Sequence, residues 1–197
     1  MEDEKIISML LLNKHKHLIN SLKLTRLSML IGLGLILFLF ESLIPRPLPW
    51  LKPGFAHVAT LLALYMMGNA TALIVIITRV LVGSLLLGSL FNPTFILALG
   101  GGVMATLAMI LIKHQFSQTF SIFGISIIGA TVHNLTQLIL VELIIVHRIE
   151  VFYLSSFMML SSIFTGFIVA LVSYLIILKV PNAANLQLKH KDIPIAD

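Results

Sequence analysis

The chain has no cysteine, few charged side chains and only three aspartates. Without cysteine, disulfides, thiol nucleophiles and thiolate metal sites are excluded, and the redox compartment stays undetermined. Charged residues make up 11% of the 197 residues, against about 25% in an average soluble domain. Since 58% of the residues are hydrophobic, a soluble globular protein is excluded.

The residues needed for common catalytic reactions are also missing. All three aspartates, Asp3, Asp192 and Asp197, lie near the ends of the chain. Hence no pair of them is placed to bind the magnesium ions that prenyl-diphosphate chemistry needs. There is no Gly-x-x-x-x-Gly-Lys loop, so ATP hydrolysis by the common route is excluded. We expect a protein that is not an enzyme and holds no metal or cofactor.

The charges that are present lie mostly at the two ends. Residues 27–178 hold only eight Asp, Glu, Lys or Arg side chains, and the flanking segments hold the other thirteen. Such a pattern indicates a middle part adapted to lipid and ends adapted to water. The formal net charge of +5 comes from scattered basic residues rather than one continuous patch, so no nucleic-acid partner is expected.

The sequence predicts an all-α, polytopic membrane protein with six transmembrane helices. A helix needs about 20 mostly apolar residues to cross a bilayer. Proline, glycine, asparagine and charged residues divide the chain into six pieces, at about 24–44, 54–67, 70–91, 93–112, 120–146 and 152–178. A basic segment, 1–23, precedes this domain of residues 24–179, and a tail, 180–197, follows it.

The second predicted span is short, and only Gly68-Asn69 separates it from the third. It must therefore begin in the preceding loop or sit beside thinned membrane. The first span is expected to serve as an uncleaved anchor, because the chain lacks the pattern of a secretory signal.

The distribution of lysine and arginine orients the predicted spans. Positively charged flanks are retained in the cytoplasm. One side receives only Arg46, Lys52 and Arg148, and the other receives Lys5, Lys14, Lys16, Lys23, Arg26, Lys113, Lys179, Lys189 and Lys191. Both termini are therefore expected to be cytoplasmic, and Lys14-His15-Lys16-His17 is expected to lie against the anionic inner leaflet.

Arg79 is the charge that lies deepest in a predicted span, about nine residues or roughly 13 Å along the third. An ionisable side chain at such a depth costs roughly 2.5–3.5 kcal/mol on insertion scales, so it needs a partner, a cavity or a function. One hypothesis is a contact to an anionic or strongly polar group of a ligand, and the other is a structural salt bridge. Glu41, near the outer end of the first span, is the best candidate to neutralise Arg79 when no ligand is bound.

The fifth predicted span carries a polar stripe made of His133, Asn134 and Gln137. Residues three and four apart lie on the same sector of a helix. An imidazole and two amides suit hydrogen bonding to carbonyl, hydroxyl or phosphate oxygens. The alternative is that these side chains hold the helices together, as Asn, Gln and His do in membranes.

Small residues indicate two places of close helix packing. The run Gly100-Gly101-Gly102 lies inside a predicted helix, where each glycine costs about 1 kcal/mol relative to alanine. We expect these glycines to allow close approach of a backbone or a ligand. Ser28 and Gly32 form a small-xxx-small pair in the first span, which favours tight packing against another helix, including one of a partner protein.

The order of motifs resembles that of the Gx transporter family, also labelled heptaprenyl diphosphate synthase component I, over roughly Lys23 to Lys179. The resemblance rests on Leu22-Lys23-Leu24-Thr25-Arg26, the Glu41 segment, Lys52-Pro53-Gly54, Leu61-Leu62-Ala63-Leu64-Tyr65, Thr78-Arg79-Val80-Leu81-Val82-Gly83, Asn92-Pro93-Thr94-Phe95, the triple glycine and His133-Asn134-Leu135-Thr136-Gln137. One departure is His57, where such proteins are expected to have Asn.

This resemblance implies a substrate-binding S component of an energy-coupling-factor importer in the bacterial cytoplasmic membrane. Its implied partners are a transmembrane coupling subunit, which Ser28 and Gly32 would contact, and two ATPases. The expected ligand is a small anionic or amphipathic molecule, such as an isoprenoid or quinone precursor, captured from outside. The older label implies the alternative of a non-catalytic membrane subunit of a prenyl synthase.

Overall fold

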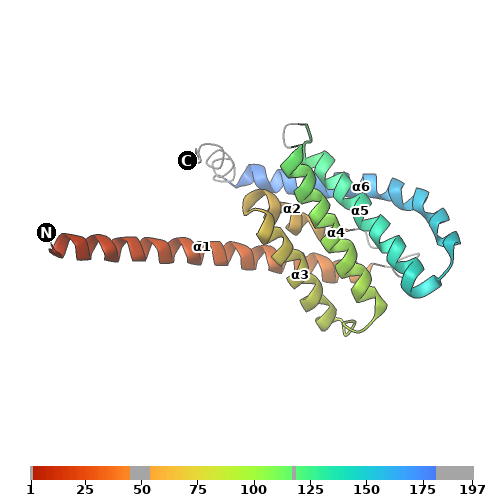
Figure 1. Ribbon diagram of the computed structural model, residues 1–197, viewed down its shortest axis with the longest axis horizontal. Helices are drawn as coiled ribbons and strands as arrows, with labels where there is room; N and C mark the ends of the chain where they lie inside the picture. The colour runs from red at the N-terminus through yellow and green to blue at the C-terminus, as the bar shows by residue number, and fades with distance from the viewer. Residues whose placement is uncertain (1, 45–53, 117–118, 181–197) are drawn as a thin grey trace.

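A computed structural model describes residues 2–44, 54–116 and 119–180, and these residues are all-helical (Figure 1). The α-helices are α1 (Glu2–Leu43), α2 (His57–Met66), α3 (Asn69–Leu86), α4 (Pro93–Gln115), α5 (Ile122–Val141) and α6 (Ser155–Lys179). A π-helical turn (Glu142–Val146) and a 3₁₀ helix (Ile149–Leu154) connect α5 to α6. The all-α prediction is confirmed for this part of the chain.

Among the described residues, five helices are long and apolar enough to cross a membrane by length and composition: Asn20–Leu43 within α1, then α3, α4, Ile122–Val146 and Phe152–Lys179. Large apolar side chains on their outer faces are exposed, for example Leu85 at 65% and Phe164 at 65%. A broad exposed apolar surface of this kind is expected of a chain that faces lipid. The structure therefore supports a multi-pass membrane protein.

The first helix is longer than the predicted span, since it begins at Glu2 and not near Leu24. No proline or glycine occurs before Gly32, so nothing in the polar segment interrupts the helix. The N-terminal part of α1 extends well beyond the bundle (Figure 1). The predicted tail, 180–197, lies outside the described residues except for Val180.

The third and fourth helices differ from their predicted spans at one end each. Helix α3 ends at Leu86 instead of Phe91 because Gly88 has a φ of +63°, a conformation that terminates helices. Asn92 caps α4, where its side-chain oxygen accepts a hydrogen bond from the Thr94 N–H at 3.2 Å. Helix α4 then runs to Gln115, past the predicted end at Ile112.

The fifth and sixth predicted spans each contain two kinds of helix. The span 120–146 is α5 followed by the π-helical turn, which ends at His147 with a φ of +52°. The span 152–178 begins in the 3₁₀ helix and continues as α6. These changes of helix type take place at the end of the bundle where α5 passes over to α6.

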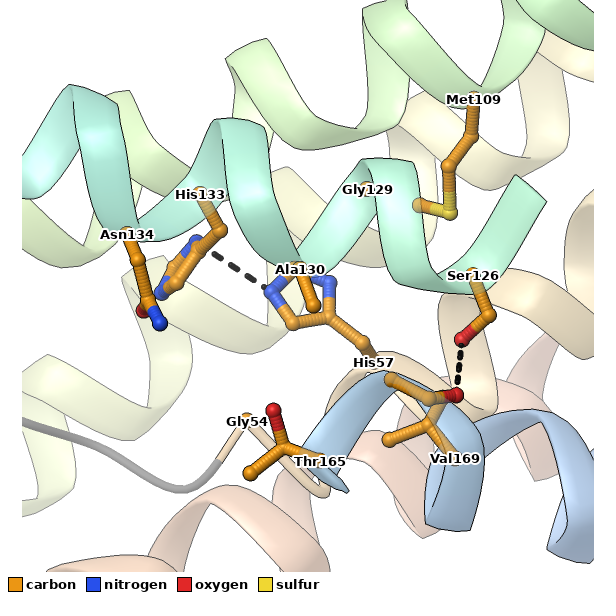
Figure 2. Close-up of a pocket in the computed structure, with 11 residues that line it drawn as sticks. Gly54, His57, Met109, Ser126, Gly129, Ala130, His133, Asn134, Thr165 and Val169 are labelled. Carbon is orange, nitrogen blue, oxygen red and sulfur yellow. Dashed lines mark hydrogen bonds between the residues drawn. The ribbon is translucent and has the colours of Figure 1, made fainter. Parts of the chain in front are cut away.

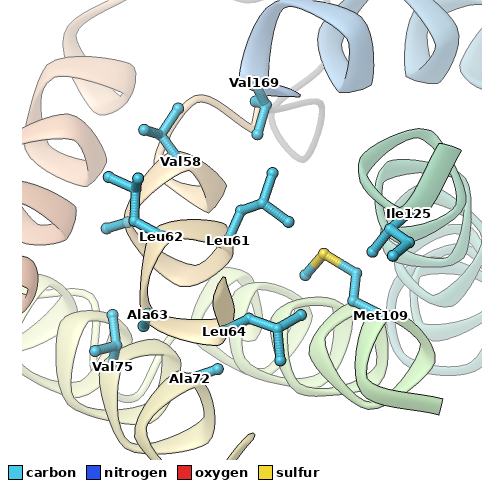
Figure 3. Close-up of a cluster of buried hydrophobic side chains, with 11 residues drawn as sticks. Val58, Leu61, Leu62, Ala63, Leu64, Ala72, Val75, Met109, Ile125 and Val169 are labelled. Atoms are coloured by element: carbon cyan, nitrogen blue, oxygen red, sulfur yellow. The ribbon is translucent and has the colours of Figure 1, made fainter. Parts of the chain in front are cut away.

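Helix α2 is the short element at the centre of the bundle. Eight consecutive residues, from His57 to Leu64, are buried, and α2 packs against α1, α3 and α6. Figure 3 shows Val58, Leu61, Leu62 and Leu64 surrounded by side chains of α3, α4, α5 and α6. Ten residues rise only about 15 Å, which is less than the thickness of a bilayer core. A helix this short can be accommodated because protein, rather than lipid, surrounds it.

Candidate functional site

Arg79 lies on the inner face of α3 and is 3% exposed. Its stem passes beside Gly34 of α1, where a Cβ atom would lie 3.2 Å from Arg79 Cδ and 3.1 Å from Ala59 Cβ. A glycine at this position therefore lets α1, α2 and α3 meet closely around the arginine. The guanidinium group is held inside the bundle instead of extending to water.

A chain of polar contacts runs from Arg79 through His57 to His133. Arg79 Nη2 lies 3.4 Å from His57 Nδ1, and His57 Nε2 lies 3.3 Å from His133 Nδ1. Figure 2 shows the two imidazole rings side by side, joined by a dashed line, and they meet edge to face at a centroid distance of 4.7 Å.

The chemistry of these groups determines which atom donates and which accepts in each contact between Arg79, His57 and His133. A guanidinium group can only donate hydrogen bonds, so His57 Nδ1 must accept from Arg79. The proton of the neutral His57 ring is then on Nε2, which donates to His133 Nδ1. Both histidines are thereby neutral in this arrangement, and the remaining N–H of His133 is on Nε2.

Several polar atoms near Arg79, His57 and His133 have no hydrogen-bond partner among the described residues. They are Arg79 Nε, Arg79 Nη1 and Gln137 Oε1, all of which are buried. An unsatisfied buried polar atom costs about 1–3 kcal/mol, and more if it is charged. The site therefore keeps hydrogen-bonding capacity, including two nitrogens of a cation, that a ligand can use.

Glu41 lies at the same place, at the C-terminal end of α1. Its Oε1 accepts a hydrogen bond from the Ala56 N–H at 3.0 Å, just before α2 begins. It is near enough to Arg79 for the two charges to attract. The carboxylate thus anchors the start of α2, and its neutralisation of Arg79 stays a prediction.

The triple glycine brings α4 against the polar residues of α5. A Cβ atom at Gly101 would lie 2.9 Å from His133 Nδ1 and 3.0 Å from Gln137 Cγ. On either side of it, Gly100 faces Leu140 of α5 and Gly102 faces Ile76 of α3. These glycines thus allow α4 to approach its neighbouring helices closely, and Gly101 allows this beside His133 and Gln137.

Asn134 faces a different neighbour from the other two residues of the predicted stripe. Its Nδ2 donates to the Met158 carbonyl at 3.1 Å and to Ser162 Oγ at 2.8 Å, both on α6. Both amide protons are therefore used in holding α5 to α6. The structure brings His133 and Gln137 together with Arg79, and it directs Asn134 to packing.

Two small adjoining cavities, each of about 20 Å³, lie beside the contacts between Arg79, His57 and His133. Both are lined by Gly54, His57 and His133. One extends to Glu41, Arg79 and Gln137, and the other extends to Asn134 and α6 (Figure 2). A cavity of this size holds about one water molecule, so a larger ligand enters by displacing side chains.

Ser28 and Gly32 lie on the outer face of α1, which is turned away from this site. Ser28 is exposed, and its hydroxyl donates to the Leu24 carbonyl of its own helix. A Cβ atom at Gly32 would meet nothing within 4 Å. These two residues therefore leave a shallow place on the surface that no other described part of the chain covers.

Two residues of the site were not selected by sequence reasoning. His57 opens the second predicted span and departs from the expected Asn, and in the structure it joins Arg79 to His133. The available signal was a histidine at the start of an otherwise apolar helix. Gly34 could be distinguished from Gly32 only after the neighbours of α1 were known.

Among the described residues, no group of three or more His, Cys, Asp or Glu side chains is placed to hold a metal ion. The cluster is instead composed of one cation, one carboxylate, two neutral imidazoles and an amide. Such a set of donors and acceptors suits an anionic or strongly polar organic group.

Comparison with known proteins finds one family for this chain. No curated protein and no solved structure matches it. The sequence model of a family described as heptaprenyl diphosphate synthase component I matches residues 30–176, which include Glu41, His57, Arg79, His133 and Gln137. A component I subunit also fits the expectation that the chain is not itself an enzyme. Since the match covers well over half of the chain, this protein belongs to the heptaprenyl diphosphate synthase component I family.

Proposed function

We propose that the protein is the membrane-embedded, substrate-binding component of an importer of the energy-coupling-factor type. The observation that carries this proposal is Arg79, a buried cation with two unpartnered nitrogens beside a small cavity. A charge buried at that depth is costly, so an ionisable residue inside a membrane usually marks a functional site. The chain also has no phosphate-binding loop, so energy for uptake has to come from partner subunits or from an ion gradient, and we propose the partner subunits.

The ligand is a small anionic or amphipathic molecule whose acidic group binds at Arg79. Guanidinium nitrogens Nε and Nη1 can donate side by side to a carboxylate or a phosphate. Gln137 Oε1 accepts a hydrogen bond from a hydroxyl or amide of the same ligand. An isoprenoid or quinone precursor is one such class of molecule.

The proposed topology has six crossings with both termini in the cytoplasm of a bacterial cell. It places Glu41 and His57 toward the outer side, from which the ligand is captured. The opposite end gathers Lys23, Arg26 and Lys113 around one groove, as the retention of basic flanks in the cytoplasm requires. The partners are a transmembrane coupling subunit and two ATPases, with the outer face of α1 as the contact surface.

A ligand-retention experiment tests the site. The full chain is purified in mild detergent, and the small molecules that it retains are identified by mass spectrometry. The variant Arg79→Gln removes the cation, and Arg148→Gln, an exposed arginine before the 3₁₀ helix, is the matched control. Losing a hydrogen bond to a charged group costs about 1.5–3 kcal/mol, so retention by Arg79→Gln falls about tenfold or more.

The same anionic compound is expected in the wild type and in Arg148→Gln. If Arg79→Gln retains it equally well, the site is wrong. If the purified protein brings neither a coupling subunit nor ATPases from native membranes, the importer is wrong, whatever the result at Arg79.

A second candidate is a non-catalytic membrane subunit of heptaprenyl diphosphate synthase, and the family description favours it. In that case, addition of the purified chain in lipid to the soluble synthase changes the rate or the length of the product. The catalytic aspartates would come from the soluble subunit, because this chain has none between Asp3 and Asp192. An unchanged rate and product length would remove this candidate.

A further inference from the structure

A large groove lies at the opposite end of the bundle from Glu41, with a volume of about 1320 Å³. One wall is the part of α1 from Asn20 to Leu27, and the floor is the end of α2 with the Gly68-Asn69 turn. The other wall is made by the end of α4 and the start of α5, including Lys113 and Ile125. The groove exceeds the roughly 300–1,000 Å³ of common small-molecule pockets.

The charges of the groove all have one sign. Lys23, Arg26 and Lys113 line it, and none of its lining residues is acidic. The two residues of α1 are exposed and stand where the apolar stretch of that helix begins. Lys113 is in the last turn of α4. All three therefore lie at the depth where a bilayer has its headgroups.

Lys113 is held in place and directed into this region. Its Nζ donates to the Leu64 carbonyl at 2.8 Å and stands 4.4 Å from the centre of the Tyr65 ring. An ammonium group has three protons, so two remain for another acceptor. Since the side chain is already fixed, little conformational entropy is lost when it binds a phosphate.

Most of the remaining wall is apolar, which indicates what kind of anion fits. Leu24 is 64% exposed and Phe120 is 38% exposed, and Leu27, Met67 and Ile122 continue the apolar surface. A free phosphate would use the basic residues and leave this surface without a partner. A molecule with a phosphate head and long apolar chains would cover both.

We propose that this groove is a binding site for an anionic phospholipid of the cytoplasmic leaflet. The phosphate lies between Lys113 and the two basic residues of α1, and the acyl chains follow the apolar side chains of α1 and α5. Basic pockets between transmembrane helices on the cytoplasmic side bind anionic headgroups by the same chemistry. The lipid joins α1 to α4 and α5 at a place where the protein leaves a gap between them.

Lipid binding by the delipidated full chain tests this proposal. Binding of phosphatidylglycerol and of phosphatidylcholine is measured by native mass spectrometry in mild detergent. The test variant is Lys113→Gln with Arg26→Gln, which removes both positive charges and keeps polar side chains at these positions. Arg26→Gln alone is a second variant, since this exposed side chain is not needed for folding. Lys179→Gln, in the last turn of α6 and outside the groove, is the matched control.

The wild type and Lys179→Gln are expected to bind phosphatidylglycerol about tenfold more tightly than phosphatidylcholine. The double variant loses that preference, and Arg26→Gln loses part of it. The proposal is overturned if both lipids bind equally, or if Lys179→Gln has as large an effect. Displacement of the lipid by millimolar inorganic phosphate would show a phosphate site and overturn it as well.

A helix of a partner protein could occupy the groove in place of a lipid, and a cross-linking experiment distinguishes the two. Leu24→Cys places one thiol in the groove of a chain that has none. A photoreactive group attached there is expected to cross-link to lipid in native membranes. Cross-linking to a polypeptide instead would assign the groove to a protein and overturn the proposal. Neither result depends on Arg79, so this test is independent of the proposed importer function.

Discussion

At the scale of single residues, the polar side chains of α5 divide into two groups with opposite roles. His133 and Gln137 face α4 and the Arg79 chain. Asn134, one residue further along than His133, faces α6 and uses both of its amide protons there. A group whose hydrogen bonds are complete stabilises the fold, whereas a buried atom without a partner costs stability and is retained for another reason.

These opposite roles predict opposite phenotypes. Asn134→Ala is expected to lower stability by about 0.6–2 kcal/mol, the range for interhelical hydrogen bonds in membranes, without changing ligand retention. Gln137→Met is expected to leave stability unchanged or raised, because it removes the unpartnered Oε1, and to weaken ligand retention. Thermal unfolding in detergent, together with mass spectrometry of retained ligand, measures both. The assignment is wrong if the two variants behave alike.

At the scale of elements, α2 is a core helix inside a membrane protein, and the other helices share their surface with lipid. Leu61 of α2 is fully buried, and Leu81 of α3 is 41% exposed. Lipid can refill the space left at Leu81, but nothing can refill a space at the centre of the bundle.

Leu61→Ala is therefore expected to cost about 2–5 kcal/mol, as for other buried leucines, and Leu81→Ala is expected to cost much less. Both variants remove the same atoms, so the comparison isolates the surroundings. The fraction of folded monomer after heating, measured by size-exclusion chromatography, shows the difference. Equal losses would mean that α2 is not enclosed as the structure has it.

The outer face of α1 is not covered by any other described part of the chain. Met29 and Ile36 are 70% and 65% exposed on either side of Gly32. In the proposed importer the coupling subunit covers this face, since small residues let two helices approach closely.

Gly32→Leu is expected to fold normally, because a side chain there meets nothing within 4 Å, and to lose co-purification of the coupling subunit. Ile163→Trp, on the exposed face of α6, adds bulk elsewhere and serves as the control. A wild-type yield of partner with Gly32→Leu, quantified by mass spectrometry, would remove α1 as the contact surface.

At the scale of the whole molecule, the described residues place the polar site and the basic groove at opposite ends of the bundle. Glu41 and His57 mark one end, and Lys23, Gly68 and Lys113 mark the other. In the proposed topology, which puts the basic end in the cytoplasm, a ligand would reach Arg79 from outside.

The orientation can be measured directly because the chain has no cysteine of its own. Phe91 lies between α3 and α4 and is 99% exposed. In the variant Phe91→Cys, the thiol should react with an impermeant maleimide in intact cells. His114→Cys, in the last turn of α4, should react only after the cells are made permeable. The reverse result would invert the proposed topology, and labelling of both in intact cells would mean that α4 does not cross.

The sequence by itself determined the class of this protein and most of its helices. Scarcity of charge and long apolar runs are sufficient for that, because the cost of exposing backbone or charge to lipid acts on each segment separately. Arg79 could be selected for the same reason, since a charge at that depth is costly whatever surrounds it.

Only the tertiary structure decided which polar groups meet. It joined Arg79 to His133 through His57, directed Asn134 to α6 and enclosed α2, whose length alone made it hard to place. Helical periodicity places His133, Asn134 and Gln137 in one sector, but a sector is broad enough to face two neighbouring helices. Which neighbour each side chain meets depends on the packing of α4 and α6 around α5, where Gly101 and Gly166 allow close approach.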